Sequence, residues 1–455
     1  MKNLILATTV AALCAGVLSA AAGGVIQTKD GKANTAYDIQ AQTVSGIIWE
    51  SERGRPGTKV KPWEVDGVRY SGNAMDEFNG LSRKLAGGQS GRLISDAQAI
   101  LNMKAPSGFD DAWSGIQLSA KYYIAMGYYL QNDWEGAVTQ LEDYIKECEK
   151  ADNLYDKSVV PRVDFTSKVS GKKVSNAGGL NRFYLDALEA LGLAYLKKGE
   201  AKTASDKAFG PLMELTENLA SNSGDKEYFD WGLRALRASA RYAEEQKDYK
   251  GARDAYDDLA RVALKKQGGK PSRASYEAQL KVGFMQILEG DTRGAQARFY
   301  EAVKAWKEAH KVNPGRSWQP RPEWISSDLA YLTAGSFLGQ GLVTAATAKK
   351  AEDWAEALEN FSESLSIFNA DDEIRSKALL GAANACAQLA ELNKGVLVEV
   401  KRNDKTEKVA LSSENYAKLA DKYVSELTSL LGKTKAAEDE SLPGIQKIIN
   451  TYKGD

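Results

Sequence analysis

The chain has 455 residues, 43% of them apolar, which is enough for two or three domains with sizeable cores. Its 60 lysines and arginines nearly balance 61 aspartates and glutamates, so the net charge of −1 gives no support for nucleic-acid binding. A single histidine, His310, excludes a His-rich metal site and disfavours a Ser-His-Asp triad.

Residues 1–22 are predicted to be a secretory signal peptide. Lys2 precedes an apolar run that ends in the small residues 19–24, which is the charged start, apolar core and cleavage region of such a signal. An uncleaved membrane anchor and lipidation at Cys14 are the alternatives, and the bulky Leu13 argues against the second. We therefore expect an exported chain, periplasmic or secreted, with no membrane span after cleavage.

Residues 23–72 are predicted to form a small β module. Short runs rich in β-branched and aromatic residues alternate with the turn signals Asp30-Gly31 and Asp66-Gly67, which indicates four or five short strands. A sheet this small needs a neighbour to cover its apolar face. We expect it to pack on the first helices through Ile47, Ile48, Trp49, Trp63 and Tyr70. Two roles stay open, capping the helical array and binding a ligand through its tryptophans.

Residues 73–455 are dominated by helical periodicity, beginning with 74–86 and 92–103. The clearest stretch is Tyr122–Ile145, where the periodicity is broken only at residues 131–133. Two helices joined by so short a turn fold back on each other as a hairpin. Small residues, Ala125 and Ala137, stand where the two helices would touch.

The same layout of small, aromatic, small and bulky residues returns along the chain. The copies are Ala125, Tyr128, Ala137 and Leu141; Gly192, Tyr195, Ala204 and Ala208; Ala240, Tyr249, Ala252 and Tyr256, with Ala243 where an aromatic is expected; Gly283, Ala295, Phe299 and Ala302; and Trp354, Ala357 and Phe361. This layout resembles the tetratricopeptide repeat (TPR), in degenerate copies with uneven spacing. The resemblance implies a helical scaffold with a concave groove and does not name a partner.

Three insertions interrupt the helical pattern, at 151–180, 311–325 and 396–411. The first is either a hairpin or an irregular loop, and the third alternates apolar and polar residues across Asn403-Asp404, which predicts a β-hairpin. The second carries Trp318 and Trp324 beside prolines, either as an aromatic contact for a partner or packed back on the helices. Helices are expected again over 416–431 and 444–452.

No catalytic, cofactor or metal motif is present in the sequence. Acidic pairs such as Asp371-Asp372 stand where helices begin, where carboxylates cap the helix and favour its dipole. Cys148 and Cys386 lie on helical patterns in different repeats and are expected to be buried thiols. We therefore expect no enzymatic activity and no cofactor.

The sharpest constellation is a set of three arginines, Arg234, Arg237 and Arg241, whose spacing places them on one helical face. The TPR resemblance implies that this face lines the groove and receives acidic groups of a peptide. The matching offsets in other copies are occupied by Tyr122, Met126, Tyr129 and Phe284. The alternative is a salt-bridged surface with Glu244, Glu245 or Asp230 as partners.

The sequence thus predicts a mainly α, TPR-like solenoid of antiparallel helix hairpins, with an N-terminal β module and a short inserted β-hairpin. The expected function is that of an exported, non-enzymatic scaffold binding a protein or peptide of the cell envelope. The alternative is a carbohydrate- or small-ligand-binding protein that uses Trp49, Trp63, Trp318 and Trp324 as stacking platforms.

Overall fold

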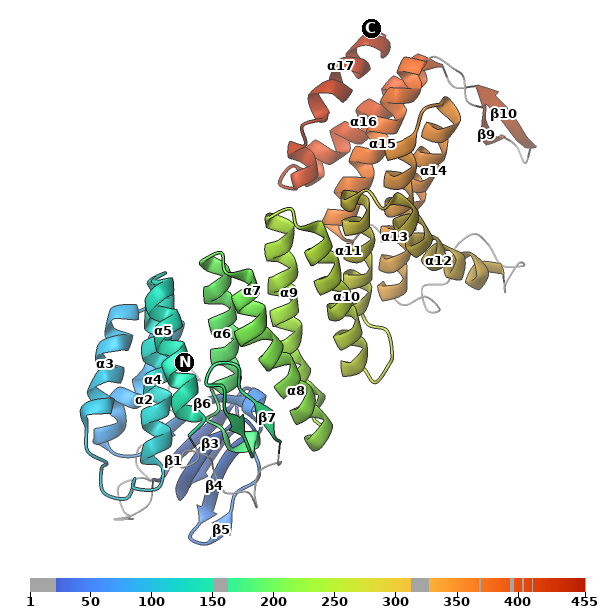
Figure 1. Cartoon of the computed structure of the whole chain (residues 1–455). Helices are drawn as coiled ribbons and strands as arrows, with labels where there is room; N and C mark the ends of the chain where they lie inside the picture. Colours follow the sequence, from blue (N-terminus) through green and yellow to red (C-terminus); the bar gives the residue numbers. More distant parts are fainter. Residues whose placement is uncertain are drawn as a thin grey trace, which may run out of the picture. The chain divides into compact units, whose positions relative to one another are not determined.

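The computed structural model describes residues 22–150, 163–311, 327–367, 370–392, 397–402, 405–410 and 412–454. The chain divides into two compact units, Met1–Ser239 and Ala240–Asp455. Consecutive helices pack as hairpins within each unit, and strands form the N-terminal module (Figure 1). The predicted mainly α, TPR-like fold with a β module and a β-hairpin is confirmed.

The β module consists of two three-stranded antiparallel sheets, in the orders β2-β1-β6 and β3-β4-β5. A strand over Asp38–Thr43 was not predicted, because DIQAQT lacks a β-branched run; it turns at Val44-Ser45 and pairs with the next strand. The strands are β1 (Gly24–Thr28), β2 (Ala33–Ala36), β3 (Asp38–Thr43), β4 (Gly46–Glu52), β5 (Arg55–Pro56) and β6 (Val65–Tyr70), with a 3-10 turn, η1 (Pro62–Glu64), before β6.

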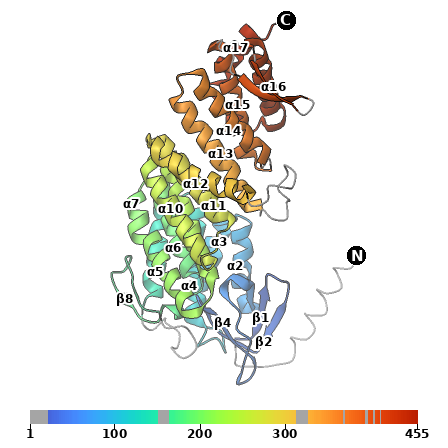
Figure 2. The ribbon, with the colours of Figure 1, turned by 90° about the vertical axis from the view of Figure 1, so that its right-hand side faces the viewer.

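The module is hydrogen-bonded to distant parts of the first unit. β3 continues into pairing with the segment before the first helix of the second repeat: the Val44 N–H donates to Leu180 O (2.8 Å) and the Arg182 N–H to Gln42 O (3.0 Å). The Tyr228 hydroxyl donates to Val44 O (2.9 Å). The strands lie at one end of the helices of this unit in Figures 1 and 2.

The helices of the first unit follow the predicted hairpins. Asp133 begins the second helix of the Tyr122–Ile145 hairpin by accepting the Gly136 N–H at 2.9 Å, while Asn132 turns the chain with φ 57°. The elements are η2 (Asn73–Met75), α2 (Asp76–Ala86), α3 (Ser90–Asn102), α4 (Trp113–Leu130), α5 (Trp134–Cys148), η4 (Ala177–Gly179), α6 (Tyr184–Lys197), α7 (Ala201–Thr203), η5 (Ala204–Phe209), α8 (Gly210–Ser223), η6 (Lys226–Tyr228) and α9 (Phe229–Glu245), within which the first unit ends.

The second copy departs from the predicted offsets. The alignment placed Ala208 where the other copies have a bulky residue, but η5 is a π-helical turn in which the Gly210 N–H bonds to Ser205 O. The extra residue in this turn brings Phe209 onto Gly192, where an added Cβ would lie 2.2 Å from the ring. Phe209 is therefore the bulky residue of this copy.

In the second unit, buried phenylalanines lock neighbouring hairpins together. Phe299 lies against Gly283 and Gly339, and Phe361 lies against Gly341 and Gly381, each glycine giving room for a ring. The helices are α10 (Tyr249–Lys266), α11 (Arg273–Glu289), α12 (Thr292–Lys311), α13 (Ser327–Thr347), α14 (Ala351–Ile367), α15 (Asp372–Leu392), α16 (Ser413–Leu431) and α17 (Leu442–Tyr452), with η7 (Lys435–Glu438) between the last two.

The insertions have different outcomes. The hairpin predicted for 396–411 is confirmed as β9 (Leu397–Arg402) paired with β10 (Lys405–Ala410). In 151–180, a short hairpin pairs β7 (Phe165–Thr166) with β8 (Lys173–Val174), and residues 151–162 lie outside the described residues. Nearly all of 311–325 lies outside them too, as do residues 1–21.

Candidate functional site

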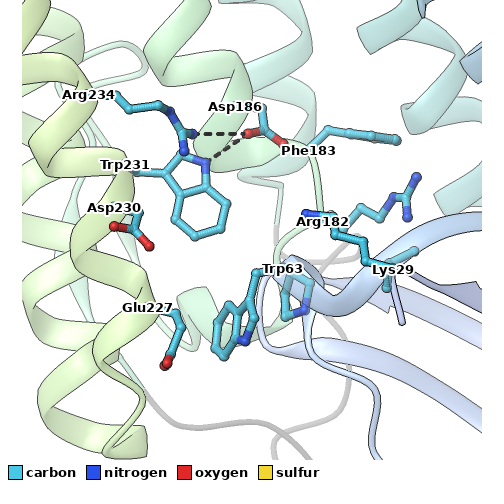
Figure 3. Close-up of a pocket in the computed structure, with 11 residues that line it drawn as sticks. Lys29, Trp63, Arg182, Phe183, Asp186, Glu227, Asp230, Trp231 and Arg234 are labelled. Carbon is cyan, nitrogen blue, oxygen red and sulfur yellow. Dashed lines mark hydrogen bonds and ion pairs between the residues drawn. The ribbon is translucent and has the colours of Figure 1, made fainter. Parts of the chain in front are cut away.

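A pocket of about 350 Å³ lies in the first unit, between the β module and the starts of α6 and α9 (Figure 3). Its volume is within the range of ligand-binding pockets. We call it the tryptophan pocket, and it is lined by Lys29, Pro62, Trp63, Val65, Arg182, Phe183, Asp186, Glu227, Asp230, Trp231 and Arg234.

One wall of the pocket is a polar cluster that joins α6 to α9. The Trp231 indole N–H donates to Asp186 Oδ1 at 2.8 Å. Arg234 holds Glu189 through both carboxylate oxygens, with N···O distances of 2.6–2.9 Å, and its guanidinium lies 5.2 Å from the Trp231 ring centroid. Burial raises the pKa of Asp186, while the Trp231 hydrogen bond opposes the rise.

The opposite wall comes from the β module. Trp63 meets the buried Tyr228 edge to face, with ring centroids 5.0 Å apart, and Lys61 lies over the Trp63 ring at 5.7 Å. Lys61 also forms an ion pair with Asp225, just before η6. These contacts fix Trp63 against the segment that leads into α9, so the two tryptophans hold defined positions in the pocket.

A third wall is the start of α6. Phe183 stacks on Tyr122 with centroids 4.4 Å apart and an interplanar angle of 6°. The Arg182 guanidinium lies 4.3 Å from the Phe183 ring, and its Nε is buried with no hydrogen bond to a described residue. Burial raises the pKa of the Tyr123 hydroxyl, and the nearby Arg182 opposes the rise. Arg182 is therefore held by aromatic contacts and lacks a full set of hydrogen-bond acceptors.

The predicted groove residues fall into different surroundings. Arg234 lines the tryptophan pocket and is paired with Glu189 and, at 3.8 Å, Asp186, instead of the partners named in the salt-bridge alternative. Arg237 is half-buried and Arg241 is exposed, and neither forms a hydrogen bond or an ion pair with a described residue.

The predicted aromatic stripe is mostly packed. Tyr122 is buried beneath Phe183, and Tyr129 meets Trp134 edge to face at 5.2 Å. Met126 is half-buried. Phe284 belongs to the second unit, where it packs against Phe299 and carries Lys377 over its ring.

The tryptophans predicted to act as stacking platforms also lie in different surroundings. Trp49 is 7% exposed, covers Gly57 and donates its indole N–H to Thr58 O at 2.9 Å, so it belongs to the core of the β module. It is therefore not available as a stacking platform. Trp63 lines the tryptophan pocket. Trp318 and Trp324 lie outside the described residues.

Sequence reasoning missed Trp231, Asp186 and Glu189 as parts of the site. Trp231 stands three residues before Arg234 and so shares its helical face, which was a usable signal. The two acids are on α6, 45 or more residues before Trp231 and Arg234. The only sign of them in the sequence was their position on the matching helix of the preceding repeat.

Metal-binding clusters and membrane-spanning helices are both absent from the described part of the chain. No cluster of three or more His, Cys, Asp or Glu side chains there is suited to hold a metal ion. No described helix has the length and apolar character needed to cross a membrane.

No family model matches the chain, and no curated protein matches it. Among solved structures, it is similar to BtubC (BKLC) from P. vanneervenii, at 15% identity over 63% of this chain and 90% of that one, with a TM-score of 0.33. It is also similar to the TPR domain of P58(IPK), at 14% identity over 84% of this chain and 100% of that one, with a TM-score of 0.20. At such low scores neither comparison supports an argument, and the fold assignment rests on the chain's own helix hairpins.

Proposed function

We propose that this chain is a non-enzymatic scaffold that binds a segment of another protein, and that the tryptophan pocket anchors that segment. The supporting observation is a pocket of about 350 Å³ with two indole rings and two arginines, set against the first helices of successive hairpins. Tryptophan and arginine are the side chains that most often dominate the binding energy of protein interfaces. Interlocking contacts hold both tryptophans before a partner arrives, which lowers the entropic cost of binding.

A display library of random dodecapeptides tests this proposal with the purified chain. Selected peptides are expected to bind the chain and to bind Trp231→Ala at least tenfold more weakly. Trp134→Ala is the matched control, because Trp134 also opens a helix and meets an aromatic ring but lies outside the pocket. Melting curves of both variants separate lost binding from lost folding. Failure to enrich any peptide, or equal losses in the two variants, would contradict the proposal.

The arginines of α9 are part of the same proposal. Arg237 and Arg241 form no ion pair with a described residue, so they are available to carboxylates of a partner segment. An acidic residue that docks against one of them would form a charge-assisted contact that is strong only where water is partly excluded.

Export is proposed on the pattern of residues 1–22, and a partner in the cell envelope follows from it. The mass of the intact exported chain is expected to correspond to a start near Ala22 or Gly23. Recovery of the chain with Met1 retained in membrane fractions would contradict this.

The carbohydrate alternative keeps Trp63, which lines the pocket beside Trp231, and its use of Trp318 and Trp324 stays a prediction. Titration with soluble oligosaccharides while tryptophan fluorescence is recorded discriminates the two functions. A saturable response that Trp231→Ala abolishes would favour the carbohydrate-binding alternative over the scaffold.

A further inference from the structure

The tryptophan pocket has walls of opposite charge. Figure 3 shows Glu227 and Asp230 on one side of the two indoles and Lys29 and Arg182 on the other. The electrostatic potential therefore differs between the two walls, and the sign of a ligand's charge decides which wall the ligand approaches.

The cations of the pocket are largely engaged within the protein. Arg234 is neutralised by the two-pronged contact with Glu189. Arg182 is held over Phe183, but its buried Nε has no hydrogen bond to a described residue. An anionic ligand group would thus find the Nε of Arg182, which lacks an acceptor, and Lys29, whose side chain is exposed and well hydrated.

Two carboxylates of the pocket have oxygens that accept no hydrogen bond from a described residue. Asp186 uses Oδ1 for the Trp231 indole, and its Oδ2 accepts no hydrogen bond from a described residue. The exposed Glu227 carboxylate likewise has neither a hydrogen bond nor an ion pair among those residues. Asp186 and Glu227 therefore keep carboxylate oxygens that are open to a cationic ligand group.

Both indole rings already attract cations of the chain. Arg234 lies 5.2 Å from the Trp231 centroid and Lys61 lies 5.7 Å from that of Trp63. Indole is the strongest of the aromatic side chains in such contacts, and its apolar surface also covers the aliphatic stem of a lysine or arginine.

We propose that the tryptophan pocket takes a lysine or arginine side chain of the partner segment. Its stem lies along Trp63 and Trp231, and its cation faces Glu227 and the free oxygen of Asp186. This inference rests on the proposed function, since it names the side chain through which the scaffold anchors its partner.

The test uses small probes in place of an unidentified partner. Nα-acetyl-lysine amide is titrated into the full chain while the indole N–H signals are followed by NMR, with Trp63→Phe and Trp231→Phe assigning the two signals. Nα-acetyl-norleucine amide has a similar stem without the charge, and Nα-acetyl-glutamate amide has the opposite charge. The lysine probe is expected to shift both signals with an affinity at least tenfold above that of either comparison probe.

Charge reversal at Glu227 provides the matched variants. Glu227→Lys is expected to weaken lysine-probe binding at least tenfold, because the new cation repels the probe. Glu214→Lys makes the same change at an exposed glutamate of α8 that forms no hydrogen bond or ion pair with a described residue, and it is expected to change binding less than twofold. Equal binding of the norleucine probe, absence of shifts at both tryptophans, or unchanged binding by Glu227→Lys would overturn the inference.

The peptide selection distinguishes this inference from the proposed function. Selected peptides that bind through the pocket without any lysine or arginine would overturn the inference and leave the scaffold standing. A lysine-probe response with no selected peptide would support the pocket chemistry and overturn the scaffold.

Discussion

Arg234 and Arg237 offer a matched test of how charge is used on α9. The two arginines are three residues apart on one helix, but only Arg234 has an ion-pair partner among the described residues. Glu189, that partner, has a side chain 17% exposed, whereas the Arg234 side chain is 45% exposed. Replacing each arginine by alanine therefore separates a shielded, two-pronged contact from an unpaired charge.

The expected magnitudes follow from this geometry. Charge-assisted hydrogen bonds contribute about 1.5–3 kcal/mol when shielded, and exposed pairs contribute about 0.2–1 kcal/mol. Because Arg234 is half-exposed, the pair should lie between these limits, and the contact with Trp231 adds about 0.5 kcal/mol. Arg234→Ala is thus expected to cost about 2 kcal/mol of unfolding free energy, while Arg237→Ala stays within about 0.5 kcal/mol of the parent.

Native-state hydrogen exchange of amides in α6 and α9 is the suitable assay, because a chain of two compact units need not unfold in one step. A double-mutant cycle with Glu189→Gln should give a coupling of about 1–2 kcal/mol. High salt should reduce the exposed part of that coupling. Equal costs for Arg234→Ala and Arg237→Ala would refute the reasoning.

Four other predictions follow from the described contacts. Arg237→Glu, alone and with Arg241→Glu, is expected to weaken binding of a selected acidic peptide roughly tenfold or more without lowering the melting temperature. Binding that is unchanged, or that does not depend on salt, would show that neither arginine contacts the peptide. Gly339→Ala is expected to cost about 1–3 kcal/mol in urea unfolding because its Cβ would lie 2.4 Å from the Phe299 ring, whereas Gly115→Ala meets nothing within 4 Å and should be neutral or stabilising. Cys148 and Cys386 are free and buried, burial raises the pKa of both thiols, and each should label with iodoacetamide only on unfolding; a disulfide joining them in a peptide map would contradict this. Unfolded thiols ionise near their ordinary pKa of 9.0, whereas burial keeps the folded thiols protonated at that pH. The contribution of the two thiols to the free energy of unfolding is therefore fully present below pH 9 and is lost as pH rises above it. Cys148→Ala with Cys386→Ala should reduce this loss of stability at high pH.

Sequence periodicity predicted the helix hairpins well, but it did not always predict which residue of a helix faces its neighbour. The small residues Ala125, Ala137 and Ala252 are fully buried, as the repeat layout predicted. The layout failed at Ala208 because a fixed offset assumes 3.6 residues per turn, and a π-helical turn inserts one more residue. A phenylalanine directly after the expected position, Phe209, was the available sign.

The candidate site was predictable only in part, because its pieces come from three separate regions of the chain. Arg234 was found from its spacing with Arg237 and Arg241, a local pattern. Its partner Glu189 is 45 residues away, and Trp63 reaches the same pocket from the β module. Such pairings depend on how hairpins stack, which a single sequence shows only through degenerate repeats.

The hydrogen bond between Tyr228 and Val44 has a consequence for the order in which the first unit is built. These residues are 184 positions apart in the chain, and β3 pairs with residues 180–182, which lie up to 140 positions from it. A ribosome adding 5–20 residues per second needs roughly 7–28 s to make the chain between Gln42 and Arg182. During this interval β3 has one edge without its native partner, and such edges are prone to pair with other chains. The N-terminal strands, although synthesised first, therefore complete their contacts only after the helices that follow them, and a chaperone that shields them during that interval should raise the yield of folded protein.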